Sequence, residues 1–165
     1  MITLEPINRE ILRAELERDE GFRAKTYRCT AGKLSIGVGR NLDDVGIRPS
    51  ETAALKITLA SVKAKGITRA QAMVLLDNDI DECLRQLARR LPWVESLDQV
   101  RKRVLVNMCF NLGISKLLGF KNTLAMIQRG DFKAAAAGML QSLWASQVGA
   151  RATRLSELMK LGPKK

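Results

Sequence analysis

The sequence contains no histidine among its 165 residues. Ser-His-Asp and Cys-His nucleophilic sites are therefore excluded, because both use an imidazole as the general base. The same absence argues against a catalytic zinc site, since such sites take most of their protein ligands from histidine. Acid–base chemistry on carboxylates does not need an imidazole and stays open.

Aromatic residues make up only 4% of the chain, so its core must be mainly aliphatic. No uncharged apolar run reaches the length of about 18 residues that a transmembrane helix needs. The N-terminus, Met1–Pro6, lacks the basic-then-apolar order of a secretory signal, so we expect the chain to stay in the cytoplasm until it is released. Three cysteines without metal-ligand spacing, Cys29, Cys83 and Cys109, are consistent with reduced thiols.

Acidic residues are few relative to basic ones: 17 Asp and Glu stand against 28 Lys and Arg, for a net charge of +11. Such a charge favours an anionic partner. The basic residues are scattered among acidic ones, and no recognition-helix or zinc-finger pattern is present. Charge alone therefore leaves nucleic acid, an anionic wall polymer and anionic lipid open.

The N-terminal segment has the pattern of an amphipathic helix that ends at Gly21. Its apolar residues recur at helical spacing: Ile7, Ile11, Leu12 and Leu16. Glu20 is then the last residue of the helix, where the partial negative charge of the final carbonyls disfavours an ionised carboxylate. A carboxyl that keeps its proton near neutral pH can act as a general acid.

Two strand-like runs follow at 25–28 and 34–38, joined by a turn that contains Gly32. Eight residues separate Glu20 from Cys29, and five separate Cys29 from Ser35. The hairpin can therefore bring both polar groups back towards Glu20. These residues alone fit equally an exposed helix-end carboxylate beside an ordinary hairpin.

The middle of the chain offers further acidic residues. Asp43 and Asp44 are rival carboxylates, although aspartates in a loop are more often solvated. A helix is predicted from 49 to 65, and a capping box of Thr68 and Gln71 starts a long helix over 69–90. Four acids crowd that helix: Asp77, Asp79, Asp81 and Glu82. Their spacing lacks a calcium-loop glycine, so we expect basic partners rather than a metal.

The C-terminal half is predicted to be helical. Ser96 and Gln99 form a second capping box before an apolar stretch, 104–110, that is typical of a core helix. Asn107 within it should hydrogen-bond internally. A tight connection between Gly113 and Gly119 leads to helices predicted over 123–129, 132–144 and 150–160.

These motifs, in this order, resemble the phage-type lysozymes of glycoside hydrolase family 24. That family has Glu, then Asp or sometimes Cys after eight residues, then Thr after five more; here the positions are Glu20, Cys29 and Ser35. The glycine pattern 36–39 is similar too, with Arg40 where the family usually has His. The similarity continues through 76–81, 96–101, 107–113, 119–124, Trp144, Arg151 and Arg154.

The resemblance implies an α+β fold that is mostly helical and two-lobed. A single lysozyme domain over 1–165 would hold a small antiparallel hairpin lobe at about 15–68 and an inter-lobe helix at about 69–90. A helical lobe at about 91–165, together with the N-terminal helix, would complete it, with a cleft between the lobes.

The resemblance also implies a muramidase that cuts the β-1,4 bond between N-acetylmuramic acid and N-acetylglucosamine. Glu20 would protonate the leaving oxygen, while Cys29 with Ser35 would position or activate water. Supporting or substrate-binding roles would fall to Asp19, Arg40, Phe110, Asn111, Arg151 and Arg154. Among these, Arg40 would pair with Asp79, and the two C-terminal arginines would approach Glu20 and Asp19.

Two departures from the family pattern keep other functions open. Cysteine in place of aspartate removes a carboxylate, so a lytic transglycosylase that uses Glu20 alone is an alternative. Serine in place of threonine keeps the hydroxyl but loses a methyl group that fixes its rotamer. The non-enzymatic alternative is a basic wall- or nucleic-acid-binding protein.

For the muramidase, we expect no cofactor, no metal, no nucleic acid and a monomer. Its partners would be peptidoglycan and, in some hosts, anionic outer-membrane or wall polymers. A holin-like membrane protein would release it from the host cytoplasm to the wall.

Overall fold

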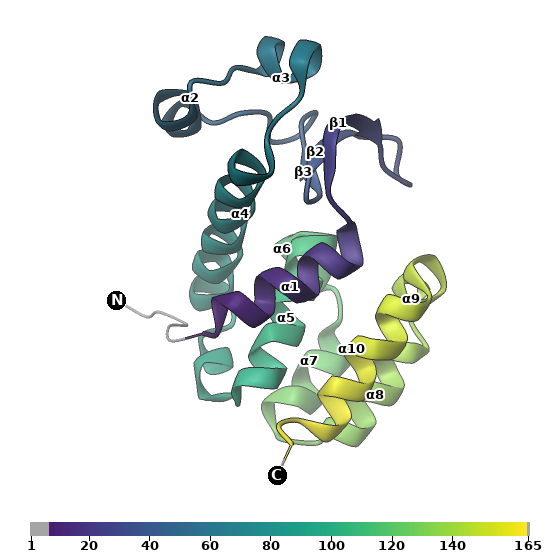
Figure 1. Ribbon diagram of the computed structural model, residues 1–165. Coiled ribbons are helices and arrows are strands. Elements are labelled where there is room, and N and C mark those ends of the chain that lie inside the picture. The colour runs from purple at the N-terminus through teal and green to yellow at the C-terminus, as the bar shows by residue number, and fades with distance from the viewer. Residues whose placement is uncertain (1–6, 165) are drawn as a thin grey trace. The chain divides into compact units, whose positions relative to one another are not determined.

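The computed structural model describes residues 7–164, which form two compact units (Figure 1). The hairpin unit comprises Glu10–Asp81, and the helical unit comprises residues 7–9 and 82–164. Helices dominate, and one small antiparallel sheet of three strands lies in the hairpin unit. The predicted fold class, α+β and mostly helical, is confirmed.

Helix α1 (Arg9–Glu20) delivers Glu20 to the start of the sheet. Leu12 and Leu16 are buried on its inner face, as their spacing predicts. Gly21 ends the helix with a φ of 74°, and its N–H donates to the carbonyl of Glu17 at 2.7 Å. The left-handed conformation is open to glycine without steric cost, so the predicted helix end is confirmed.

The sheet has the order β1 (Arg23–Arg28), β2 (Leu34–Gly37) and β3 (Arg40–Asn41). Both predicted strand runs are present, and the short β3 was not predicted. In the antiparallel register Tyr27 lies opposite Ser35. A chain reversal after β1 is closed by the N–H of Gly32, which donates to the carbonyl of Cys29 at 2.8 Å.

The helix predicted over 49–65 is wrong, because two helices occupy this stretch. Helix α2 (Pro49–Leu55) ends at Lys56, whose φ of 58° is left-handed, and α3 (Leu59–Lys65) restarts with Thr58 as its cap. The break turns Ile57 inwards, where it joins an aliphatic core with Ile36 and Val62. Tertiary packing has here overridden local helix propensity.

Helix α4 (Arg69–Arg90) has the predicted bounds. Its capping box is reciprocal: the Gln71 N–H donates to Thr68 Oγ1 at 3.1 Å, and the Thr68 N–H donates to Gln71 Oε1 at 3.0 Å. The short 3₁₀ helix η1 (Pro92–Ser96) follows it.

The core helix of the helical unit is α5 (Gln99–Leu112), which is buried along 102–109. Its predicted capping box of Ser96 and Gln99 is wrong, because the cap is Asp98, whose side chain accepts from the Arg101 N–H at 2.9 Å. Asn107 makes the internal hydrogen bond expected of it, accepting from Arg151 Nε at 3.0 Å.

Five further helices follow α5 in the helical unit. They are α6 (Ile114–Leu118), α7 (Lys121–Gln128), α8 (Phe132–Leu140), α9 (Leu143–Val148) and α10 (Ala150–Leu161). The single helix predicted over 132–144 is wrong, since Ser142 caps a new helix by accepting from the Ala145 N–H. Helix α6 fills the connection between the two glycines.

Within residues 7–164, no helix combines the length and the apolar character that crossing a membrane requires. The predicted lack of a secretory signal concerns Met1–Pro6, which lie outside the described residues.

Candidate active site

All three predicted catalytic residues belong to the hairpin unit, as do two of the predicted supporting residues. The other four predicted supporting residues belong to the helical unit: Phe110, Asn111, Arg151 and Arg154. The hairpin unit therefore contains the groups that would carry the chemistry.

The Glu20 carboxylate packs against the backbone of Gly39. A Cβ added to Gly39 would lie 2.9 Å from Glu20 Oε2 and 3.0 Å from its carboxyl carbon, and the φ of Gly39 is 68°. The left-handed conformation favours glycine at this position, and a larger residue would displace the Glu20 carboxyl group. Close contact with the backbone after β2 limits how far the half-buried carboxyl can move.

Tyr27 lies within electrostatic reach of Glu20 and Cys29 and opposite Ser35 in the sheet. Burial raises the pKa of its phenol, and the charges of Glu20 and Cys29 raise it further, so both groups lie within electrostatic reach. Ser35 is its neighbour across the β1–β2 ladder. The N–H of Gly39 donates a hydrogen bond to the Tyr27 oxygen, which works against these shifts.

Tyr27 was not among the residues that the sequence predicted for the site. Two signals point to it in retrospect: it is the one tyrosine of the chain, and it stands two residues before Cys29. Residues two apart on an extended chain face the same side.

Cys29 and Ser35 are held by the backbone of the same turn. The Cys29 N–H donates to the carbonyl of Lys33 at 3.0 Å, and the Ser35 hydroxyl donates to that carbonyl at 3.2 Å. Ser35 is buried, whereas the Cys29 side chain is half-buried. The serine oxygen keeps its lone pairs as acceptors because its proton is engaged.

The rival carboxylates Asp43 and Asp44 are exposed and engaged in the loop after β3. Asp43 Oδ2 accepts from the Leu34 N–H at 2.9 Å. Asp44 accepts from the side chain of Asn41 at 2.9 Å and lies 3.3 Å from Lys33 Nζ. Both carboxylates thus stabilise the turn.

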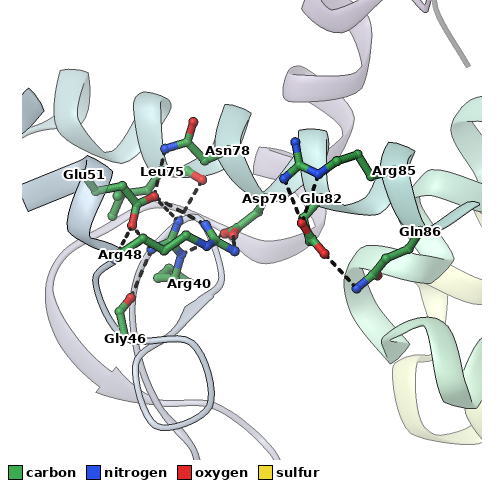
Figure 2. A network of polar contacts seen from close by, with 10 residues as sticks. All are labelled: Arg40, Gly46, Arg48, Glu51, Leu75, Asn78, Asp79, Glu82, Arg85 and Gln86. Carbon is green, nitrogen blue, oxygen red and sulfur yellow. Dashed lines mark hydrogen bonds and ion pairs between the residues drawn. The ribbon is translucent and has the colours of Figure 1, made fainter. Parts of the chain in front are cut away.

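Arg40 is the centre of a buried ion network (Figure 2). We call it the Arg40 network; its side chains are Arg40, Arg48, Glu51, Asn78 and Asp79. Glu51 accepts from both terminal nitrogens of Arg40, at 2.7 and 2.6 Å, and Asp79 Oδ2 accepts from Arg40 Nε at 3.0 Å. The predicted pairing of Arg40 with Asp79 is confirmed, and Glu51 is an additional partner that the sequence did not predict.

The pKa values of the two acids in this network are shifted in opposite directions. Burial alone would raise the pKa of Glu51, but hydrogen bonds from Arg40 and Asn78 lower it to about 2. For Asp79, burial outweighs the nearby guanidinium groups of Arg40 and Arg48, and its pKa is raised. Glu51 is therefore the anionic anchor of the network.

Acid should weaken this network through Glu51. Because its folded-state pKa lies below the ordinary value of 4.5, its contribution is complete above about pH 4.5 and is lost as the pH falls towards 2. At about 1.4 kcal/mol per pKa unit, we expect a loss of up to about 3 kcal/mol. The raised pKa of Asp79 has the opposite effect: its protonation in acid favours the folded state and so reduces the net loss of stability.

Urea unfolding of the parent and of Glu51→Gln across this pH window measures the loss. The variant cannot titrate at position 51, so its free energy of unfolding should fall less steeply with acid. Parallel curves for the two proteins would contradict the assignment of this contribution to Glu51.

Two other acids of α4, Asp77 and Glu82, also face basic side chains, as expected for them. Asp77 accepts from Arg13 at 2.9 Å, and within the helical unit Glu82 accepts from Arg85 at 2.7 Å. In the described part of the chain, no three His, Cys, Asp or Glu side chains gather as a metal site would require.

Three more of the predicted supporting residues make contacts within their own unit: Asn111, Arg151 and Asp19. Asn111 Oδ1 accepts from the Trp144 indole N–H at 2.7 Å, so its amide orientation is fixed. Arg151 is buried and donates to Asn107. Phe110 and Arg154 are half-buried on α5 and α10. In the hairpin unit, the Asp19 side chain is buried and lies 3.7 Å from Arg18 Nε.

Comparisons with known proteins point to one family. A family model described as phage lysozyme matches residues 17–160. "Probable T4-type lysozyme 1" of Dictyostelium discoideum is 26% identical over 156 residues, which is 89% of this chain and 92% of that protein. "Probable T4-type lysozyme 2" of the same organism is 26% identical over 163 residues, covering 92% and 94% of the two chains.

In a third relative, the similarity covers only a part of a longer protein. "Pre-baseplate central spike protein Gp5" of Enterobacteria phage T4 is 27% identical over 157 residues, which cover 89% of this chain but 27% of that protein. The family match and these relatives span both units of the chain.

Proposed function

The chain belongs to the phage lysozyme family, a family of lysozyme glycosidases, and we propose that it is an endolysin muramidase. It would hydrolyse the β-1,4 bond between N-acetylmuramic acid and N-acetylglucosamine in peptidoglycan. The observation that carries the proposal is that one unit holds Glu20 next to Gly39 and binds both Cys29 and Ser35 to the Lys33 carbonyl of the adjoining hairpin.

Glu20 is the proposed general acid, which donates its proton to the leaving glycosidic oxygen. The contact with Gly39 supports this role, because it restrains the carboxyl that must meet the scissile bond. The supporting role proposed for Arg40 is to anchor the backbone next to that glycine. Arg151, Arg154, Asp19, Phe110 and Asn111 are proposed to hold the carboxylates or the sugar chain.

Cys29 and Ser35 are proposed to position the attacking water on the other face of the sugar. Ser35 has acceptor lone pairs available, and Cys29 lies in the turn that holds both residues. An inverting reaction of this kind leaves room for water between acid and base, typically with about 6.5–9.5 Å between them. No metal or organic cofactor takes part in this scheme.

The second candidate function is that of a lytic transglycosylase. The observation that favours it is Cys29 itself, which stands where most of the family has a carboxylate. A transglycosylase uses one acid and closes the sugar on itself, so it does not need the second carboxylate.

Mass spectrometry of digested, purified peptidoglycan tests the proposal. We expect soluble fragments with reducing ends, because water adds to the sugar in hydrolysis. Fragments with 1,6-anhydro ends would identify a transglycosylase instead. Release of no fragments by folded protein would contradict both and favour a binding protein.

Variants of Cys29 test the water-positioning role. Cys29→Asp should stay active, since a carboxylate accepts the proton of the water readily. Cys29→Ala should lose much of the rate, and a bulky thiol reagent should inactivate the parent. Cys83→Ala is the control, because Cys83 and Cys109 are buried and should matter little. Cys29→Ala that cuts walls as fast as the parent would make Cys29 a spectator.

The proposed setting is host cell lysis at the end of a phage infection. A holin-like membrane protein would then give the protein access to the wall from inside the cell. The net charge of +11 would favour binding to anionic wall polymers or outer-membrane lipid. The protein is proposed to act as a monomer without nucleic acid.

A further inference from the structure

We propose that Glu51 is a positioning residue of the active site, which acts through Arg40 to hold the Gly39 backbone against the Glu20 carboxylate. The inference rests on the proposed role of Glu20 as the acid. Glu51 lies in the first turn of α2 and is 1% exposed. None of its atoms has to touch substrate for this role.

The position of Glu51 is itself set by several donors. Glu51 Oε1 accepts from the Arg48 N–H at 2.8 Å, which ties the carboxylate to the start of its own helix. Glu51 Oε2 accepts from Asn78 Nδ2 on α4 at 2.9 Å. The start of α2 and helix α4 therefore hold the Glu51 carboxylate in place independently of Arg40.

Arg40 is bound to this fixed carboxylate by two parallel hydrogen bonds, one from each terminal nitrogen. Charge-assisted pairs of this bidentate form combine strength with a defined geometry. The remaining donors of the guanidinium are used as well: Nη1 donates to the Gly46 carbonyl at 3.0 Å, and Nη2 to the Leu75 carbonyl at 3.2 Å. Arg40 is 1% exposed, so water cannot replace a lost partner.

The backbone connects Arg40 directly to the acid. Gly39 precedes Arg40 by one peptide bond and lies so close to Glu20 that an added Cβ would be 3.0 Å from the carboxyl carbon. The N–H of Gly39 also binds the Tyr27 oxygen. A displacement of Arg40 would therefore move Gly39, Tyr27 and Glu20 relative to one another, and a misplacement of about 1 Å can cost about 10²-fold in rate.

Asp79 is the weaker of the two anionic partners. Its side chain is 15% exposed, and it contacts Arg40 through Nε alone while Arg48 also contacts it at 3.2 Å. Glu51, in contrast, is fully enclosed and takes both ends of the guanidinium. The structure therefore assigns the positioning role to Glu51, and Asp79→Asn should disturb the site less than Glu51→Gln.

The test compares Glu51→Gln with Val62→Ala, a matched control that loosens the same unit at a buried position outside the Arg40 network. Both are assayed well below their unfolding temperatures. The first readout is kcat and KM on soluble glycan fragments. The second is the NMR signal of the Tyr27 ring, which is unambiguous because the chain has one tyrosine.

We expect Glu51→Gln to lower kcat at least ~10-fold with little change in KM, and to shift the Tyr27 ring signals. Val62→Ala should change neither, even at an equal loss of stability. Glu51→Asp, which keeps the charge, should recover part of both effects, and it replaces Glu51→Gln if that variant does not fold. Glu51→Gln that matches Val62→Ala in kcat and in the Tyr27 signals would overturn the proposal.

The two readouts separate this proposal from the proposed function. If Glu20 is not the acid, Glu20→Gln will keep its activity, yet the Tyr27 signals will still report whether Glu51 positions the Gly39 backbone. If Glu20 is the acid and Glu51 is only structural, Glu20→Gln will lose activity while Glu51→Gln leaves the Tyr27 signals unchanged.

Discussion

Replacing Arg40 with alanine is expected to lower the free energy of unfolding by about 3–5 kcal/mol, the usual cost of removing one partner of a buried ion pair. The cost arises because Glu51, whose side chain is 0% exposed, would lose its bidentate partner and keep only the more distant Arg48, at 3.4 Å, as a cation. The same substitution would remove the hydrogen bond from Arg40 Nε to Asp79. Urea unfolding followed by circular dichroism measures this loss.

The control for Arg40 is Arg13, which makes a comparable ion pair in a different environment. Arg13 Nη1 lies 2.9 Å from Asp77 Oδ1, but the two side chains are 34% and 38% exposed. Exposed pairs contribute roughly 0.2–1 kcal/mol, so Arg13→Ala should destabilise little. Similar losses for Arg13→Ala and Arg40→Ala would mean that the burial of the Arg40 network does not determine its energy.

Features marked by local signals could be predicted from the sequence. Gly21 ends α1 because a left-handed residue closes the helix, and the Thr68–Gln71 capping box starts α4 because its two side chains satisfy free N–H groups. Both signals lie within a few residues of the feature that they specify. These two signals therefore predicted the end of α1 and the start of α4.

Features decided by tertiary contacts were missed. The break between α2 and α3 lies at Lys56, a residue with no intrinsic preference for a left-handed conformation, and it serves to bury Ile57. Glu51 looked like an ordinary acid in the first turn of a helix, since nothing in its neighbourhood marks a buried arginine eleven positions earlier.

The candidate site could be predicted only in part, because some of its contacts also depend on the tertiary structure. The family resemblance, together with their spacing, singled out Glu20, Cys29 and Ser35. The same resemblance paired Arg40 with Asp79, although they are 39 positions apart. Tyr27 and Gly39 act through space, by burial and by close approach to Glu20, and spacing alone does not reveal such contacts.

The largest effect on activity is expected from Glu20→Gln. The amide keeps the shape of the side chain and its contact with Gly39, but it has no acidic proton to give to the leaving oxygen. General acid catalysis typically contributes about 10²–10⁴-fold, so wall-lytic activity should fall at least ~10²-fold. Glu10→Gln is the matched control, because it makes the same change of charge at an exposed position of the same helix.

The most direct test of Glu20 as the acid is the initial rate at which new reducing ends appear in purified peptidoglycan, measured for parent, Glu10→Gln and Glu20→Gln. Circular dichroism first establishes that all three proteins are folded. The parent and Glu10→Gln should release reducing ends at equal rates, and Glu20→Gln should reach no more than about a hundredth of that rate. Retention of more than about a tenth of the parent rate by folded Glu20→Gln would contradict the account.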